Sequence, residues 1–376
     1  MHPFENEIEI VDITPSEPLL CKTPFHQVLV DPKGDLYICC GSHIQNMTPV
    51  AGNLLQQDAL DIWNNDIYKT FRMSFVDGSL RYCNEKTCSA AANKDNPALR
   101  NLVHSVDEIE KDPGLFNSNF SDYLNAPENF DGALVSPPTR LYLGMDPSCN
   151  LQCPSCRNEL YMEEKGSQRL DTIYGNLRSI TPGIEFLEFD GAGDVFASRW
   201  YQKFLHQFPV DDFPNLQMVT LRSNGLLWTD KNWYRIHPYL RSMAIYACIS
   251  VDAATAETYA TVRGGCFERL MKNLKFVQRL HQIGEINEIT LVMVYRKSNY
   301  QEIPAFIELG KSLGASYLVI HPLQAWSESA YVIEGSYDHE AIHLRSHPLH
   351  GEFQDFIQKH GIVSGYSESV FIDFSW

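Results

Sequence analysis

The chain lacks long apolar runs, a secretion signal and an excess of basic residues. None of its uninterrupted apolar stretches is long enough to span a bilayer, which argues against a transmembrane helix. The acidic start Met1–Glu7 lacks the charged-then-apolar pattern of a signal peptide, so we expect a cytoplasmic protein with no membrane partner. The formal net charge of −17 disfavours nucleic acid as a partner, because phosphate binding requires a basic surface. A cationic substrate is compatible with this charge, and a solvated acidic surface is the simpler explanation.

The ten cysteines are grouped in a way that favours metal binding in a reducing compartment over disulfides. Cys149, Cys153 and Cys156 have the spacing C-x3-C-x2-C and follow the β-prone run Leu141–Leu143, so we expect them on a loop that leaves a strand. Thiolates are the usual ligands of iron–sulfur clusters. Three thiolates leave one iron of a four-iron cluster open for a substrate or cosubstrate. A zinc knuckle is the alternative interpretation of this spacing.

Together with Asn150, Leu151 and Pro154, this cysteine loop resembles the signature of radical S-adenosylmethionine (radical SAM) enzymes. The resemblance implies a [4Fe–4S] cluster whose open iron chelates the amino and carboxylate groups of SAM. It further implies that an electron from the cluster breaks the sulfonium and yields a 5′-deoxyadenosyl radical, with Cys149, Cys153 and Cys156 as the catalytic ligands. Ser155 departs from the family, because many members carry an aromatic residue there that packs near the adenine.

From Thr139 onward, predicted strands alternate with predicted helices, such as 255–282 and 300–313. This alternation indicates an α/β fold built from parallel β/α units. The predicted strands cover residues 140–144, 184–190, 216–222, 243–251, 288–295 and 316–321. Six such units fit the partial (β/α)6 TIM-like barrel of the radical SAM family. In barrels of this kind, the chemistry is expected at the C-terminal ends of the strands.

A glycine-rich loop follows the second predicted strand. Glycines such as Gly191 and Gly193 allow a backbone to approach a ligand closely. With Asp194, they match the position of the family's G-G-E-P motif, whose backbone and carboxylate hold the SAM amino group. Ala192 replaces the second glycine of that motif. A plain turn between strand and helix is the alternative.

The next two predicted strands end in polar residues that also resemble SAM-binding segments. Ser223 and Asn224 resemble the T-N-G at the end of the third strand, and Ser250 and Asp252 resemble the S-x-D segment near the SAM ribose. Hydroxyl, amide and carboxylate groups suit ribose hydroxyls, and the guanidinium of Arg263 suits the SAM carboxylate. A cap, a turn or a surface pair is the alternative for Ser250, Asp252 and Arg263.

Three further residues have open roles. Cys248 shares a strand face with Ser250, and a thiol inside the barrel can donate a hydrogen atom, as in radical epimerases. A small buried residue is the simpler interpretation of Cys248. His321 ends the sixth predicted strand and either faces substrate or belongs to the core or a turn, while Cys266 has no assigned role.

The N-terminal part contains a predicted hairpin with strands 26–30 and 36–40, followed by a predicted helix over about 58–75. The hairpin brings Cys21 and Cys39 together, and Cys83 and Cys88 close the region. We expect Cys40 to point away from Cys39 and to serve in packing.

The motifs around these cysteines, Gly34-x4-Cys39, G-N-L, I-W-N-N and C-x4-C, resemble the SPASM/twitch domain of many radical SAM enzymes. The resemblance implies a second, auxiliary [4Fe–4S] cluster. Its ligands would be four cysteines, namely Cys21, Cys39, Cys83 and Cys88. The C-x2-C-x5-C-x3-C run of a further cluster is absent. A structural zinc site with four cysteine ligands is the alternative.

The predicted organisation places a small α+β auxiliary domain before the barrel, whereas it follows the barrel in most relatives. A linker rich in Asn, Asp and Pro, with one or two short helices, is expected between them. The segments are an arm at 1–17, the auxiliary domain at 18–92, the linker at 93–137, the barrel at 138–325 and a C-terminal segment at 326–376 that packs over the barrel or lines substrate.

These features predict a radical SAM oxidoreductase or maturase that abstracts a hydrogen atom to modify a peptide, of the type that matures ribosomal natural products. A dehydrogenase or epimerase of a sugar or aminocyclitol is the alternative, and a zinc-binding interaction protein is the alternative from another class. Flavodoxin or ferredoxin is the implied electron donor. Since we see no leader-binding domain, a peptide substrate implies a separate recognition protein.

Overall fold

The computed structural model describes most of the chain. The described residues are 19–77, 79–84, 88, 103–105, 130–189, 191–325, 337–362, 365–367 and 370–372. Several features predicted from the sequence lie outside these residues. They are the arm at 1–17, most of the 93–137 linker, and part of the C-terminal segment at 326–376.

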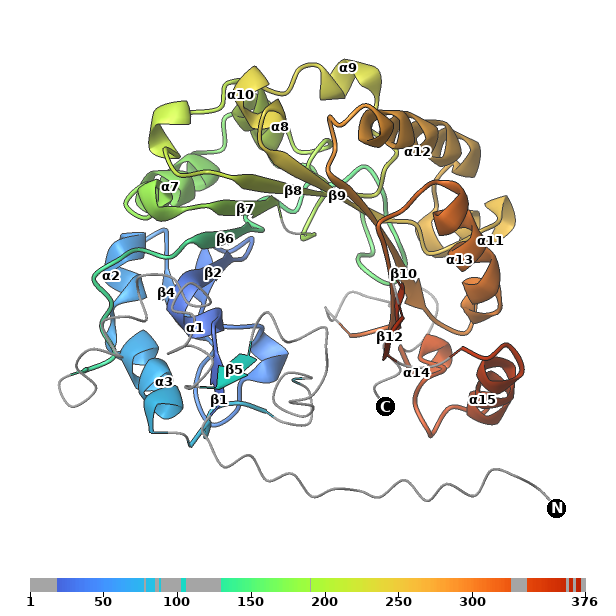
Figure 1. Cartoon of the computed structure of the whole chain (residues 1–376), viewed down its shortest axis with the longest axis horizontal. Coiled ribbons are helices and arrows are strands. Elements are labelled where there is room, and N and C mark those ends of the chain that lie inside the picture. Colours follow the sequence, from blue (N-terminus) through green and yellow to red (C-terminus); the bar gives the residue numbers. More distant parts are fainter. Residues whose placement is uncertain are drawn as a thin grey trace.

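Six parallel strands form the centre of the fold, and they are neighbours in chain order. They are β6 (Arg140–Leu143), β7 (Phe186–Phe189), β8 (Met218–Ser223), β9 (Ala244–Ser250), β10 (Glu288–Tyr295) and β11 (Tyr317–Pro322). Their positions confirm the predicted strands to within two residues at each end. The sheet curves into an open arc with helices on its outer side (Figure 1), which confirms the predicted α/β partial barrel.

Helices connect successive strands along the outside of the arc. They are α7 (Gln168–Leu177), α8 (Arg199–His206), α9 (Asp230–Trp233), α10 (Pro238–Arg241), α11 (Ala256–Arg263), α12 (Phe267–Gln282) and α13 (Ile303–Ser312). The predicted single helix over 255–282 was wrong. Gly264 has a left-handed backbone with φ of 70°, which ends α11 before α12 begins. Short 3-10 turns cover Gly41–His43, Thr181–Gly183, Val210–Asp212 and Tyr300–Glu302.

The two faces of the sheet differ in character because side chains alternate along each strand. Residues such as Leu187, Leu221 and Ile249 are fully buried under the outer helices and form the core. The alternate residues face the inside of the arc, and several are polar, including Tyr142 and Arg222. Most of these inner side chains are half-buried, so the concave face is accessible and polar rather than filled with an apolar core.

The N-terminal hairpin belongs to the same sheet as the barrel. Its strands are β2 (Gln27–Val30) and β3 (Asp35–Tyr37), which pair antiparallel, and β4 (Val50–Asn53) pairs with β3. β2 also pairs in parallel with β6, placing Val28 beside Leu141. The described part of this sheet has eleven strands. Strands from both sides of the expected 93–137 linker therefore belong to one sheet. A separate pair joins β1 (Leu19–Cys21) to β5 (Val103–Ser105).

Three local predictions in this region were wrong. The helix expected over 58–75 is divided into α2 (Ala59–Trp63) and α3 (Asp66–Val76), because the Asn65 side chain accepts hydrogen bonds from two amides and starts a new helix. The second hairpin strand ends at Tyr37 rather than Cys40, and Cys40 is exposed instead of serving in packing. The short helix α1 (Thr23–His26) leads into β2.

The described C-terminal residues extend and cover the last strands. They form α14 (Tyr337–Glu340), α15 (His350–Lys359), β12 (Gly365–Ser367) and β13 (Val370–Ile372). β13 pairs in parallel with β11, and Phe353 of α15 stacks on Tyr295 with ring centroids 5.3 Å apart. Within the part of the chain that the structure describes, no helix is long and apolar enough to cross a membrane.

A fully buried arginine joins the hairpin region to the segment that leads into the barrel. Arg72 of α3 donates from Nε to the Pro24 carbonyl at 2.8 Å and from Nη1 to the Gly132 carbonyl at 2.9 Å. Its guanidinium carbon lies 4.1 Å from the ring centroid of Trp63. Removal of the side chain leaves buried carbonyl groups without donors, which is unfavourable.

We expect Arg72→Met to lower the free energy of unfolding by about 3 kcal/mol, because two buried acceptors lose their partner. Urea unfolding followed by circular dichroism measures this change. Arg178→Met is the matched control, since Arg178 pairs with Asp212 at the surface and its side chain is 60% exposed. An equal loss in both variants would contradict the role assigned to Arg72.

Candidate active site

The cysteine loop follows β6 directly and is fixed at several points. One oxygen of the buried Asp146 carboxylate accepts from the Ser148 amide at 2.9 Å, and the other accepts from the Ser198 hydroxyl at the start of α8. The Cys149 amide donates to the Tyr161 carbonyl at 3.0 Å. The chain therefore holds this loop against α8 through its own hydrogen bonds.

The three thiols of the loop differ in exposure but share one positive neighbour. Cys153 is buried, Cys149 is half-buried and Cys156 is exposed. Burial lowers the pKa of Arg157, but the nearby thiolates of Cys156, Cys149 and Cys153 outweigh this effect and raise it. Arg157 also donates to the carbonyls of Pro147, at 2.7 Å, and Ala192, at 2.8 Å. One guanidinium thus links the thiols to the glycine-rich loop.

Gly193 explains how the glycine-rich loop packs on the cysteine loop. A Cβ atom at this position would lie 2.5 Å from the Ser148 carbonyl oxygen and 2.6 Å from that of Asp146, so only glycine fits. Gly191 is exposed, and a Cβ atom there would meet only Arg222, at 3.8 Å. Close approach is therefore required at Gly193, between two loops of the protein itself.

Asp194 is buried and holds three loops together. One carboxylate oxygen accepts from the amides of Phe196 and Ala197 at 3.0 and 3.1 Å. The other accepts from the Ser223 hydroxyl at 2.8 Å and the Asn224 amide at 2.7 Å. Burial raises the pKa of Asp194, and these hydrogen bonds oppose that rise. The carboxylate is occupied by the protein, so Asp194 acts here as a positioning residue.

Asn224 reaches the cysteine loop from the end of β8. Its Nδ2 atom lies 3.7 Å from the Cys149 sulfur and 3.0 Å from the Asn150 side-chain oxygen, donating to both. Hydrogen bonds to cysteine sulfurs tune iron–sulfur clusters. The Ser223 hydroxyl is directed to Asp194 instead. The sequence predicted that both residues lie at the site, and the structure brings Asn224 to Cys149.

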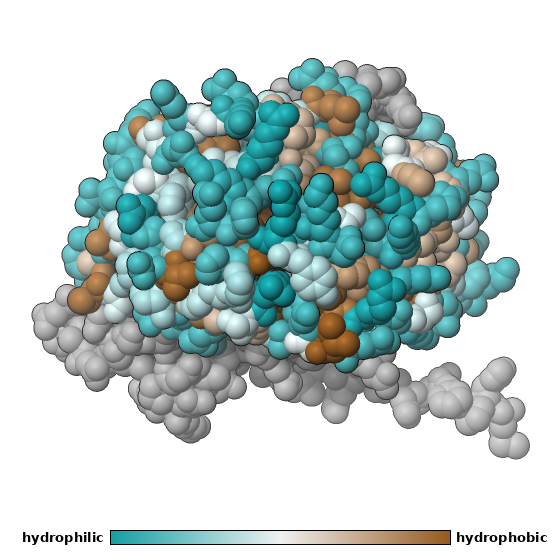
Figure 2. All heavy atoms as spheres, turned by 90° about the horizontal axis from the view of Figure 1, so that it is seen from above, coloured by the Kyte–Doolittle hydropathy of each residue, from teal (hydrophilic) through white to brown (hydrophobic). Residues whose placement is uncertain are grey.

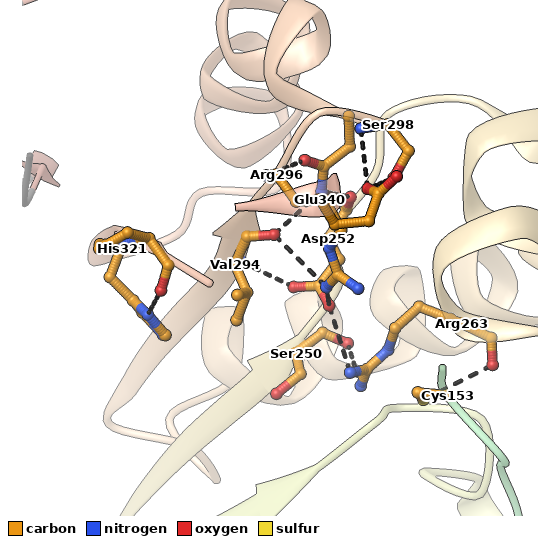
Figure 3. A network of polar contacts seen from close by, with 11 residues as sticks. Cys153, Ser250, Asp252, Arg263, Val294, Arg296, Ser298, His321 and Glu340 are labelled. Atoms are coloured by element: carbon orange, nitrogen blue, oxygen red, sulfur yellow. Dashed lines mark hydrogen bonds and ion pairs between the residues drawn. The ribbon is translucent and has the colours of Figure 1, made fainter. Parts of the chain in front are cut away.

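Asp252 lies fully buried between two arginines (Figure 3). Its Oδ2 atom is 3.3 Å from Arg263 Nη1 and 3.3 Å from Arg296 Nη2, while Oδ1 accepts from the Val294 amide at 2.8 Å. Asp252 has φ of 62°, a conformation that non-glycine residues rarely adopt. The Asn299 amide group donates to its carbonyl and fixes this backbone.

Arg263 connects this ion-pair network to the cysteine loop. Its Nη2 atom donates to the Ser250 carbonyl at 3.2 Å, and its own carbonyl accepts from the Cys153 sulfur at 3.6 Å. Its buried Nε makes no hydrogen bond to any described residue. Sequence reasoning named Arg263 and missed Arg296 and Asn299. Their position directly after β10, at the carboxyl end of a parallel strand, was the available signal.

A second polar row crosses the concave face on three neighbouring strands. Arg222 of β8 donates from Nε to Glu188 of β7 at 2.7 Å and from Nη1 to the Cys248 sulfur of β9 at 3.4 Å. Cys248 is 9% exposed, so its burial agrees with the simpler prediction, and it has a polar partner. His321 contacts the Pro322 carbonyl at 3.1 Å, and Cys266 is exposed at the start of α12.

The N-terminal cysteines form a second group. Burial raises the pKa of Cys39 well above its ordinary value, and the thiolates of Cys21, Cys40 and Cys88 add to this rise. Burial also raises the pKa of Cys21, with a smaller contribution from Cys88. Cys21 and Cys88 therefore lie near enough to Cys39 to raise its pKa, and the Cys83 backbone forms a bridge with Ile44. An iron centre would favour the thiolate forms.

Both groups consist of cysteine thiols, the usual ligands of iron–sulfur clusters, and in the first group Asn224 donates toward the Cys149 sulfur. Among the described residues, no group of three or more His, Cys, Asp or Glu side chains is arranged to hold a single metal ion.

Residues 21–89 match the SPASM family model, which is described as an iron–sulfur cluster-binding domain. This match confirms the predicted SPASM resemblance for the segment that contains Cys21, Cys39, Cys83 and Cys88, and it supports an iron–sulfur cluster there. It covers less than half of the chain. None of the curated proteins matches the sequence.

Several solved structures are similar to this chain at low sequence identity. SuiB of Streptococcus suis bound to its precursor peptide SuiA is 13% identical, with 95% of this chain and 72% of that chain covered and a TM-score of 0.45. SuiB bound to S-adenosylmethionine is 15% identical, with the same coverage and a TM-score of 0.44. Native anSMEcpe with bound AdoMet and Cp18Cys peptide is 16% identical, with 62% of this chain and 63% of that chain covered and a TM-score of 0.39.

We expect Asp252→Asn to lower the free energy of unfolding by about 3–5 kcal/mol, because two buried guanidinium groups lose their counter-charge. The double variant Asp252→Asn/Arg296→Met should recover part of this loss, since one of the buried charges is removed. Urea unfolding measures both changes. The exposed pair of Glu308 and Lys311 supplies the control, Glu308→Gln. If Asp252→Asn and Glu308→Gln behave alike, the network does not stabilise the site.

Proposed function

We propose that this chain is a radical SAM enzyme that modifies a peptide by hydrogen-atom abstraction. The observation that carries the proposal is the Cys149–Cys153–Cys156 loop at the carboxyl end of β6, which contacts Asn224 after β8 and Arg263 at the end of α11. Three thiols supplied by one loop leave one coordination position of a four-iron cluster for a cosubstrate. The sequence around this loop resembles the radical SAM signature.

The protein's own residues hold and orient the reacting groups in this proposal. Cys149, Cys153 and Cys156 hold the first cluster, and Asn224 donates toward the Cys149 sulfur. When bound, the cluster and SAM supply an electron and a 5′-deoxyadenosyl radical that removes a hydrogen atom from the substrate. Arg263 has an Nε donor without a described partner and is the proposed contact of the SAM carboxylate.

The remaining SAM-site residues take two kinds of role in the proposal. Gly191 is exposed beside the loop and offers its backbone to the SAM amino group. Ser250 lies at the end of β9, near the proposed ribose position. Asp194 and Asp252 are buried among protein donors, so we assign them to positioning the loops and Arg263 rather than to direct contact with SAM.

The concave face is the proposed substrate surface. It is polar, half-accessible and bounded by the strand ends that carry the cysteine loop. Arg222 and Glu188 pair across it, and Tyr142 lies beside Glu188 on β6. Such groups orient a polar substrate by hydrogen bonding, which positions one C–H bond for abstraction.

A peptide is the proposed substrate because enzymes with SPASM/twitch domains mostly modify peptides. Dehydrogenation or epimerisation of a sugar or aminocyclitol is the second candidate. Cys248 is the observation that favours epimerisation, since its thiol lies on the concave face beside Arg222. A short precursor-peptide gene beside the gene of this chain would support the first candidate, whereas neighbouring glycosyl or aminocyclitol genes would support the second.

The N-terminal cysteines are proposed to hold the auxiliary cluster, which accepts or relays electrons or binds substrate. A flavodoxin or ferredoxin is the proposed reductant, and a separate protein is proposed to recognise the peptide.

We expect the anaerobically reconstituted chain to be brown, to bind about eight iron atoms, and to release 5′-deoxyadenosine when reduced with SAM. Cys149→Ala should lose this release and about half of the iron, because the first cluster loses one of its three ligands. Chromatography of the nucleoside and an iron assay measure these results. Cys266→Ala, at an exposed thiol outside the loop, is the control. A colourless protein that retains zinc would contradict the proposal.

The auxiliary ligand set gives a separate expectation. Cys88→Ala should reduce the iron content from about eight to about four atoms per chain, since it removes one of four proposed ligands. Cys40→Ala should keep the full iron content, because Cys40 is exposed and is not a proposed ligand. Iron loss in Cys40→Ala equal to that in Cys88→Ala would show that the ligand set is wrong.

A further inference from the structure

A pocket outside the candidate active site opens between α8 and the segment 232–236 on the outer helical layer. Its volume is about 260 Å³. Figure 2 shows that the helical face at the top of Figure 1 is covered mainly by hydrophilic side chains. The floor of the pocket is different, because the buried side chains Phe196, Leu205 and Ile236 line it.

Four basic side chains surround this apolar floor. They are Arg199, Lys203, His206 and Arg235, and all four are exposed. The lining residues include no Asp or Glu, although the chain has 47 acidic residues against 30 Lys and Arg. A basic concentration of this kind is unexpected on a protein with a net charge of −17.

None of these four side chains has a hydrogen-bond or ion-pair partner within the described part of the chain. Other arginines behave differently. Five of them each pair with a carboxylate, namely Arg169, Arg178, Arg222, Arg241 and Arg263. The side-chain amides at the pocket are hydrogen-bonded within the protein. Gln202 donates to the Phe196 carbonyl, and Asn232 donates to the Leu227 carbonyl. The cationic groups are therefore available to a ligand.

The arrangement is costly without a ligand. Arg199, Lys203 and His206 lie at positions i, i+4 and i+7 of α8 and share one helix face, so the like charges of Arg199 and Lys203 repel each other. Arg199 is also the first residue of α8, where a cation is unfavourable beside the positive end of the helix dipole. Cations in the last turn of a helix interact favourably with the helix dipole, which explains the positions of Lys203 and His206. This interaction does not explain Arg199 or Arg235.

We propose that this pocket binds a small organic phosphate. The phosphate oxygens accept charge-assisted hydrogen bonds from Arg199, Lys203 and Arg235, and the apolar part of the ligand lies on Phe196, Leu205 and Ile236. His206 adds a further positive charge when it is protonated. This inference is independent of the proposed catalytic function, because no residue of the pocket belongs to either cysteine group.

Calorimetric titration of the full chain with phenyl phosphate at constant ionic strength tests the proposal. We expect saturable binding, and we expect Arg199→Gln/Arg235→Gln to bind at least about tenfold more weakly, because two charge-assisted hydrogen bonds are lost. Lys275→Gln is the matched control, since Lys275 is exposed on α12 outside the pocket. Circular dichroism establishes that each variant is folded.

Inorganic phosphate, titrated in parallel, tests the role of the apolar floor. We expect it to bind more weakly than phenyl phosphate, since it has no apolar part to bury. Equal affinities for the two compounds would overturn the assignment to an organic phosphate. No saturable binding of either compound, or the same weakening in Lys275→Gln as in the pocket variant, would overturn the site altogether.

Discussion

The buried carboxylate of Asp194 makes the interaction on which the candidate active site depends. The carboxylate accepts from the Phe196 amide of its own loop and from the Asn224 amide after β8, and the Asp194 amide donates to the Ser148 carbonyl of the cysteine loop. Asp194 therefore joins three segments that are distant from one another in sequence. Gly193 allows the same loops to approach to contact distance. The positions of Cys149 and Asn224 therefore follow from one buried acid and one residue without a side chain.

The second constraint is the charge balance around Asp252. One carboxylate faces Arg263 and Arg296, so the network keeps a net positive charge next to Cys153. Burial raises the pKa of Cys153, and the positive charges of Arg263 and Arg296 oppose that rise and so favour the thiolate, which is the form that binds iron. The left-handed backbone of Asp252 directs its carboxylate between the two arginines and also places its carbonyl at Asn299.

Much of the architecture could be predicted because it depends on local sequence patterns. Alternating strands and helices predicted the six parallel strands, and the β-prone run Leu141–Leu143 before the cysteines predicted the loop after β6. Contacts between distant segments carry no such local signal. The pairing of β2 with β6, the network around Arg296 and the burial of Arg72 depend on which elements meet after folding. The two helices that were expected to be continuous are each divided by one residue. Gly264 adopts a left-handed backbone that ends α11, and Asn65 caps the start of α3.

The pairing of β2 with β6 has a mechanical consequence. In the sequence, β2 lies between Cys21 and Cys39, and β6 ends shortly before Cys149. Backbone hydrogen bonds between these two strands tie both cysteine groups to one rigid ladder, so no hinge separates them along this path. The distance between redox centres bound by these cysteines would then be set by the covalent and hydrogen-bonded framework. The rate of electron tunnelling between them would therefore not vary with a hinge motion of the two parts.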